Sequence, residues 1–217
     1  MAPFTEPGNL DVTPNGAFVY VASVAAEISV IDTATNTATA AGSGITAFSL
    51  AITPDGAFVY ATEAAGTTVR VISTASNTVV ATIPFPDGPL GVAITPNGAS
   101  AYVTSFTGVS VIDTATNTVS ATVPLGDLGT TVSITPDGAF AWVSLGTTST
   151  VAVVATATNT VAATIVTGGT PIGIAFVVMT PPAPTSKDQW KNGGWQTFTN
   201  PTFKSQGECI KYVNQLP

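Results

Sequence analysis

One four-residue turn sequence occurs four times along the chain at nearly constant intervals. Thr-Pro-Asx-Gly begins at Thr13, Thr53, Thr95 and Thr135, so the spacings are 40, 42 and 40 residues. A second sequence, Ile-Asp-Thr-Ala-Thr-Asn-Thr or a variant of it, keeps the same phase and begins at positions 31, 72, 112 and 154. Because two markers stay in register over four copies, the chain is predicted to repeat one structural unit of about forty residues.

Each repeat contains four short runs rich in Val, Ile, Thr and aromatic residues, which favour strands. In the third copy these runs cover residues 90–94, 100–104, 109–112 and 118–123. The Pro, Asx and Gly of the first marker suit a tight turn, and the Asn of the second suits a left-handed turn residue. Four-stranded units of this length are typical of propeller blades. The predicted fold class is therefore all-β, a β-propeller of four-stranded blades with a short C-terminal tail.

The repeats predict the domain organisation. The propeller region is expected over residues 1–180, with an extra strand at 171–179, a Pro-rich linker at 181–186 and an aromatic C-terminal module at 187–217. Within the propeller region the blades are expected at about 7–46, 47–88, 89–129 and 130–170.

The second strand of each repeat carries a recurring tetrapeptide: Tyr-Val-Ala-Ser at Tyr20, Tyr-Ala-Thr-Glu at Tyr60, Tyr-Val-Thr-Ser at Tyr102 and Trp-Val-Ser-Leu at Trp142. With the flanking Pro-Asp-Gly and Ile-Asp-Thr-Ala-Thr-Asn-Thr-Val, residues 7–180 resemble the YVTN-type β-propeller repeat. This resemblance implies an extracellular, periplasmic or cell-surface bacterial propeller, usually of about seven blades and mostly without assigned chemistry. The tail resembles a short module of bacterial secreted proteins, in which a Cys that pairs with the later Cys typically stands where this chain has Trp190.

The repeats do not determine how the propeller ring closes. Residues 171–177 match the first strand of a repeat, although the N-terminal copy already has one near 10–12. Three interpretations follow: a portion of a longer propeller, a closed four-bladed ring with one strand displaced, or an open arc. The arc would pair with another copy through open blade edges, for example as an eight-bladed dimer.

The charge distribution excludes several functions. Residues 1–180 hold ten carboxylates and a single cation, Arg70, so no nucleic-acid partner is expected. No apolar run of 18 residues exists, so no membrane span is expected. The first residues lack the basic and apolar regions of a signal peptide, which fits a cytoplasmic protein or one whose signal was removed. Arg70 is expected to be a solvated outer-strand residue, with pairing to Glu63 or an anion as alternatives.

Catalytic chemistry is not expected. The chain has no histidine, and the repeats have no lysine, which removes the usual general base and Schiff-base nucleophile. Asp32 and Asp113 recur beside turns and are predicted to cap them rather than bind metal, because calcium needs several converging oxygens. No cofactor is expected. The predicted function is a binding or scaffold module for protein, peptide or glycan; the alternatives are a lyase- or dehydrogenase-like enzyme using channel carboxylates and a structural subunit of an oligomer.

A candidate binding face follows from the strand order. In a four-stranded meander the first and third turns emerge on one face, and the second turn and the blade-to-blade loop emerge on the other. The second set of loops differs between copies, and binding residues concentrate on loops carried by a rigid scaffold. This variable loop face supplies the candidate ligand-binding residues, which are Glu27, Glu63, Phe85, Asp87, Phe106 and Asp127.

Overall fold

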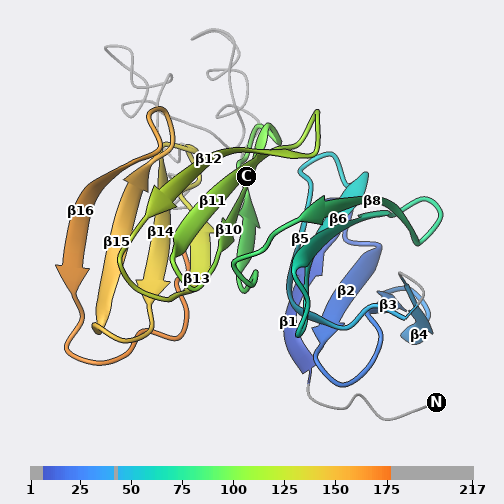
Figure 1. Ribbon diagram of the computed structural model, residues 1–217. Helices are drawn as coiled ribbons and strands as arrows, with labels where there is room; N and C mark the ends of the chain where they lie inside the picture. The colour runs from blue at the N-terminus through green and yellow to red at the C-terminus, as the bar shows by residue number, and fades with distance from the viewer. Residues whose placement is uncertain (1–6, 42–43, 177–217) are drawn as a thin grey trace, which may run out of the picture. The chain divides into compact units, whose positions relative to one another are not determined.

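A computed structural model describes residues 7–41 and 44–176 of the 217-residue chain (Figure 1). The chain divides into two units, Met1–Phe176 and Val177–Pro217. The predicted linker at 181–186 and the predicted module at 187–217, which contains the chain's single cysteine, Cys209, lie outside the described residues.

Sixteen strands form four separate antiparallel sheets in the described part of the chain, each with its four strands in sequence order. This is the predicted meander, and the fold is a β-propeller of four-stranded blades. The first blade consists of β1 (Pro7–Val12), β2 (Phe18–Ser23), β3 (Ser29–Asp32) and β4 (Thr37–Ala40). The second consists of β5 (Ala47–Ile52), β6 (Phe58–Glu63), β7 (Thr68–Ser73) and β8 (Thr78–Pro84). The third consists of β9 (Val92–Ile94), β10 (Ser100–Thr104), β11 (Gly108–Asp113) and β12 (Thr118–Pro124). The fourth consists of β13 (Gly129–Ile134), β14 (Phe140–Leu145), β15 (Thr150–Ala155) and β16 (Thr160–Val166).

The two repeated sequences meet at one corner of each blade. In the second blade, the Thr53 hydroxyl donates to Asp55 Oδ1 (2.6 Å) and accepts the Phe58 amide (3.0 Å), which closes the first turn. Thr74, from the second marker, donates its hydroxyl to the Gly56 carbonyl at 2.7 Å. Equivalent bonds occur in the other three blades. The two markers therefore recur together because they hydrogen-bond to each other.

The repeated aspartates cap turns, as the sequence predicts. Asp32 Oδ1 accepts the amides of Ala34 and Thr35, both at 2.9 Å, and Asp113 Oδ1 accepts the amide of Thr116. These bonds, chiefly those from Thr35 and Thr116, lower the pKa of each carboxyl. Among the described residues no three His, Cys, Asp or Glu side chains gather into a possible metal site.

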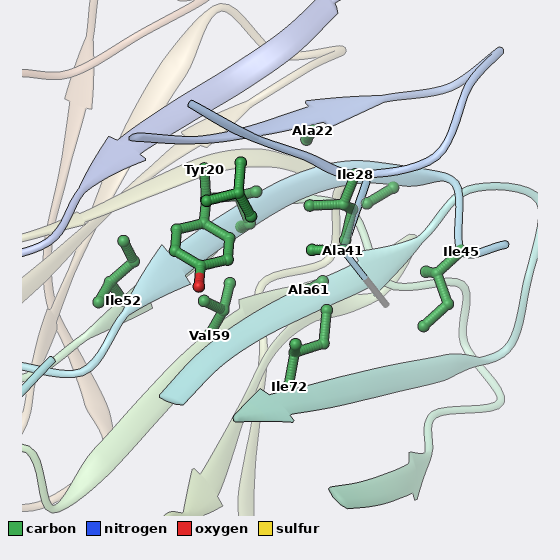
Figure 2. Packing of buried hydrophobic residues seen from close by; sticks show 12 residues of the cluster. Tyr20, Ala22, Ile28, Ala41, Ile45, Ile52, Val59, Ala61 and Ile72 are labelled. Carbon is green, nitrogen blue, oxygen red and sulfur yellow. The ribbon is translucent and has the colours of Figure 1, made fainter. Parts of the chain in front are cut away.

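The core lies between the blades, not within any single sheet. Side chains alternate across a strand, so each blade presents one apolar face to the blade before it and one to the blade after it. Between the first two blades, Tyr20 and Ile28 pack with Ile52, Val59 and Ile72 (Figure 2). Corresponding clusters join the second blade to the third and the third to the fourth. A blade is therefore stable only when a neighbour covers it.

A buried tyrosine joins each of the first three blades to the next. Tyr20, Tyr60 and Tyr102 are each 1 % exposed, and their hydroxyls donate at 2.6 Å to Oδ1 of Asn77, Asn117 and Asn159, respectively. Each asparagine has a positive φ of 53–55°, which is the left-handed conformation predicted for this turn residue. Burial raises the pKa of all three tyrosines, that of Tyr60 to about 12, so the hydroxyls stay protonated as donors.

Apolar side chains on the outer faces of the first and fourth blades are exposed. Leu10 and Val12 are 59 % and 44 % exposed, whereas their counterparts in the second blade, Leu50 and Ile52, are 1 % and 8 % exposed. Ile165 in the last blade is 40 % exposed, although its counterpart Ile83 is 2 % exposed. A closed four-bladed ring would bury these side chains, so the described blades do not form one.

The predicted extra strand at 171–179 is only partly described, and its described part is not a strand. Residues 171–176 have no strand assignment, and no strand among the described residues pairs with them. They still occupy the place of a first strand: the Ser133 hydroxyl donates to the Ile174 carbonyl at 2.7 Å, and Phe176 packs edge-on against Trp142 with ring centroids 5.8 Å apart.

Candidate functional site

The predicted division of the loops between two faces is confirmed by their contacts. Loops that join blades bond to the turns between the second and third strands: the Ile28 amide donates to the Ile45 carbonyl at 3.0 Å. Thr107 likewise donates to Asp87 at 3.5 Å. The first and third turns meet at the other face, through the threonine-to-glycine bonds described above.

A cleft of about 820 Å³ lies where the first strands of the blades come together. One position per repeat lines it: Phe48, Leu90, Thr130 and Ile172 stand at the same place in four successive first-strand segments. Hydroxyls of Ser49, Thr131 and Ser133, the Asn9 amide, and the loop side chains Phe106 and Leu128 also line the cleft. Among the described residues no charged side chain lines it.

Side chains hold neighbouring first strands together around this cleft. Asn9 Nδ2 donates to the Leu50 carbonyl at 2.9 Å, and the Leu50 amide donates to Asn9 Oδ1 at 2.7 Å. Asp11 Oδ2 accepts the amide of Ile52 at 2.8 Å. These bonds satisfy backbone groups that no ladder partner reaches. The cleft wall is therefore held by hydrogen bonds before any ligand arrives.

Phe106 is the predicted site residue that lines the cleft. Its side chain is 62 % exposed and lies over Gly88, where an added Cβ would overlap the phenyl ring. Gly88 also has a positive φ of 66°, so the turn itself favours glycine there. The Phe106 amide donates to the Asp87 carbonyl at 3.3 Å, which places these two predicted residues side by side. Asp87 itself is exposed and is not part of the lining.

Glu63 ends strand β6 and Glu27 lies in the β2–β3 loop, both on the variable loop face, and neither lines the cleft. Glu63 forms an ion pair with Arg70, with Oε1 3.2 Å from Nη2, and accepts the Thr68 hydroxyl. The Thr68 bond, followed by Arg70, lowers the pKa of Glu63. Of the alternatives for Arg70, pairing with Glu63 is the one observed. Glu27 is exposed and has no hydrogen-bond partner among the described residues.

Two predicted residues are anchored in the protein rather than presented to solvent. Phe85 is 3 % exposed and packs in the cluster with Val69 and Val103, so its side chain belongs to the core. Asp127 is 8 % exposed and accepts the hydroxyls of Thr147 and Thr148, which join the loop before the fourth blade to a loop within it. These two hydroxyls, with further bonds from backbone amides, lower the pKa of Asp127 to about 2.

Asp127→Asn is expected to destabilise the protein above pH 4 and to flatten its acid unfolding profile. An unfolded aspartate has a pKa of about 3.9. Because the folded pKa is depressed to about 2, the stabilisation is present above the unfolded value and is lost as the pH falls toward 2. Loss of hydrogen bonds to a charged group costs about 1.5–3 kcal/mol. Urea unfolding between pH 2 and 7 measures this effect. Asp87→Asn is the matched control and should change stability by no more than about 0.5 kcal/mol.

The strand positions that line the cleft were not among the residues predicted from the sequence. Phe48, Leu90 and Thr130 lie in first strands, and the argument from loop variability does not reach strand residues. Their signal is visible in the repeat alignment, where one strand position changes from Phe to Leu to Thr while a core position two residues later stays aliphatic, as Leu50, Val92 and Val132.

Four-stranded blades packed face to face around a cleft define a β-propeller-type protein. No known protein-family profile matches the chain, and no curated protein matches it. Among solved structures it is similar to a hydrazine synthase of Kuenenia stuttgartiensis, with a TM-score of 0.69 and 24 % sequence identity. The match covers 76 % of this chain and 50 % of that one, so this chain spans about half the length of that protein. At this identity the likeness shows the fold alone.

The described residues contain no helix long and apolar enough to cross a membrane.

Proposed function

We propose that this chain is a non-catalytic binding module of the YVTN propeller type and that its ligand occupies the central cleft. The observation that carries this proposal is that one side chain per repeat lines the cleft, namely Phe48, Leu90, Thr130 and Ile172. These side chains can vary between repeats without disturbing the cores between the blades, so the lining can be adapted to a ligand. Concave, mostly apolar sites with a few polar groups are the usual form of ligand sites.

The cleft chemistry favours a neutral segment of a protein or peptide over a glycan. Leu90, Leu128 and Ile172 offer aliphatic surface, and the hydroxyls of Ser49 and Thr131 offer hydrogen bonds to backbone amides. A charged ligand would lose its hydration without gaining a partner from the described lining. Because the described lining contains no carboxylate, it lends no support to the alternative of an enzyme using channel carboxylates.

A location outside the cytoplasm is part of this proposal. It is supported by the YVTN-like tetrapeptides at Tyr20, Tyr60 and Tyr102 and by the resemblance of residues 187–217 to a module of secreted proteins. Immunodetection of the tagged native gene product in fractionated cells of the source bacterium tests it; recovery in the cytoplasm alone would contradict it.

Phe106→Ala is expected to weaken ligand binding about tenfold, because exposed aromatic anchors carry much of the energy at binding sites. The thermal midpoint should stay unchanged, since Phe106 is 62 % exposed. Binding is measured by calorimetry on hits from a panel of neutral apolar peptides and neutral oligosaccharides. Phe140→Ala, an exposed phenylalanine after a turn of the opposite face, serves as the control. Equal loss of binding in both variants would contradict the proposed cleft. Hits confined to oligosaccharides or charged peptides would contradict the proposed ligand class.

A further inference from the structure

The same interface between blades occurs three times within the chain, and at its two ends no further blade covers the outer halves among the described residues. We call the exposed side of the first blade, with Leu10, Val12 and Asn36, the leading face. We call the outer side of the fourth blade, with the half-buried Trp142, the buried Val153 and the exposed Ile165, the trailing face. Inside the chain, counterparts of the leading face always pack on counterparts of the trailing face. The chain therefore carries both halves of an interface that its own blades show to be complementary.

The leading face and the trailing face also match in their hydrogen-bonding groups. Asn36 has a φ of 54° and stands where Asn77, Asn117 and Asn159 accept a tyrosine hydroxyl, but it accepts no such bond from the described residues. At the other end, Trp142 takes the place of the tyrosine. An indole N–H is a donor, like the tyrosine hydroxyl. The donor of one end thus corresponds to the acceptor of the other.

We infer that the trailing face of one copy of this chain binds the leading face of a second copy, so that two chains of four blades close head to tail. Continuity with the three internal interfaces supports this occupant over an unrelated protein. The contact would bury Leu10, Val12 and Ile165, which are 40–59 % exposed and uncharged. Apolar area of this kind is the main favourable contribution to association.

In a single chain, residues 171–176 occupy the position that β1 of the second copy takes in the dimer. We call these residues the placeholder segment. It occupies the trailing face where β1 of the second copy must lie, and no backbone ladder holds it among the described residues; its contacts there include the Ser133 bond and the edge contact of Phe176 with Trp142. β1 is held more firmly, because it forms a backbone ladder with β2 and side-chain bonds to β5. Association therefore displaces residues 171–176 rather than β1, and Ile172 then leaves the cleft lining while Phe48, Leu90 and Thr130 remain in it.

The inference is tested by the solution mass of the full 217-residue chain, measured by light scattering over a concentration series. The expected result is a concentration-dependent species of twice the 21.7 kDa chain mass. Leu10→Glu and Ile165→Glu should each give monomers of unchanged thermal midpoint. Val80→Glu, an equally exposed apolar residue of the second blade, should still dimerise. A wild-type chain that is monomeric at all concentrations, or one that grows beyond two copies, would overturn the inference.

Mixing the two variants separates a head-to-tail interface from one in which identical faces meet. A Leu10→Glu chain keeps an intact trailing face, and an Ile165→Glu chain keeps an intact leading face. The 1:1 mixture should therefore regain a dimer through one intact interface. Failure of the mixture to associate, while wild type dimerises, would reject the head-to-tail arrangement.

Two further variants test the residue pairing. Asn36→Gly keeps the left-handed turn but removes the acceptor, and should weaken dimerisation about five- to tenfold without changing the stability of the isolated chain. Asn77→Gly, its internal counterpart, should lower stability and leave dimerisation unchanged. Phe176→Ala should strengthen dimerisation about two- to tenfold by loosening the placeholder segment. Weaker dimerisation of Phe176→Ala would show that residues 171–176 belong to the interface and would refute their displacement.

Discussion

Tyr60→Ala is expected to lower the free energy of unfolding by about 3–5 kcal/mol, the range for removing a buried aromatic side chain. Tyr60 is 1 % exposed, packs between the second and third blades, and donates to Asn117 at 2.6 Å. For a chain of this size each kcal/mol corresponds to about 2–4 °C in thermal midpoint. Urea and thermal unfolding measure the loss. Val80→Ala, on an exposed position of the same blade, should change stability by no more than about 0.5 kcal/mol.

The hydrogen bond of Tyr60 can be separated from its packing by a double-mutant cycle. Tyr60→Phe keeps the ring and removes the hydroxyl, and Asn117→Gly keeps the positive φ and removes the acceptor. A coupling of about 1 kcal/mol between them is expected for a direct hydrogen bond. Additive effects of the two substitutions would mean that the bond does not contribute to stability.

The same tyrosine should make the protein sensitive to alkali. Burial, with the charge of Asp113 as a smaller cause, raises the pKa of Tyr60 from 10.0 to about 12. The folded protein holds this proton more tightly than the unfolded chain, so stability falls as the pH rises from 10 toward 12. Tyr60→Phe should show a smaller decrease over this interval than wild type. An identical decrease in the two proteins would exclude Tyr60 as a cause.

Gly108→Ala is expected to have the second large effect, because the backbone itself leaves no room for a side chain. Gly108 has a φ of 154°, and an added Cβ would overlap the Val123 carbonyl and lie 2.9 Å from the Leu125 nitrogen. Strain at such a backbone conformation costs about 1–3 kcal/mol. Displacing the packed neighbours costs about 1–3 kcal/mol more.

Gly126→Ala is the control for the Gly108 substitution. Gly126 also has a positive φ, 68°, but no atom lies within 4 Å of the position of an added Cβ. Its substitution should cost only the strain of the left-handed conformation, about 1 kcal/mol. Equal loss of stability in the two variants, measured by urea unfolding, would show that the contact with β12 plays no part.

The elements of each blade were predictable because their determinants are local. In the third copy, the predicted runs at 90–94, 100–104, 109–112 and 118–123 correspond to β9 to β12, and the left-handed Asn117 falls where predicted. A Thr-Pro-Asx-Gly turn closes with its own side chains, so its sequence specifies its geometry wherever it occurs. The cap formed by Asp32 was predictable for the same reason, because its partners lie two and three residues away.

The candidate site was less predictable because its residues are far apart in the chain. Loop variability indicated Phe106, which lines the cleft, but also Phe85 and Asp127, which the tertiary contacts bury. Both loops vary in sequence, yet one side chain turns inward to a blade core and the other bonds to Thr147 in another loop. Neither contact can be predicted from the neighbouring residues in the sequence.

The repeat, the four-stranded meander of each blade and the corner where the two markers meet depend on contacts within one repeat, so local residues are enough to specify them. The role of the recurring Tyr and Asn follows from packing between blades, because the donor and acceptor lie 57 residues apart in different blades. The tertiary structure also determines that the first and last blades keep exposed faces. Repeats resemble one another locally, and only packing distinguishes a covered face from an open one.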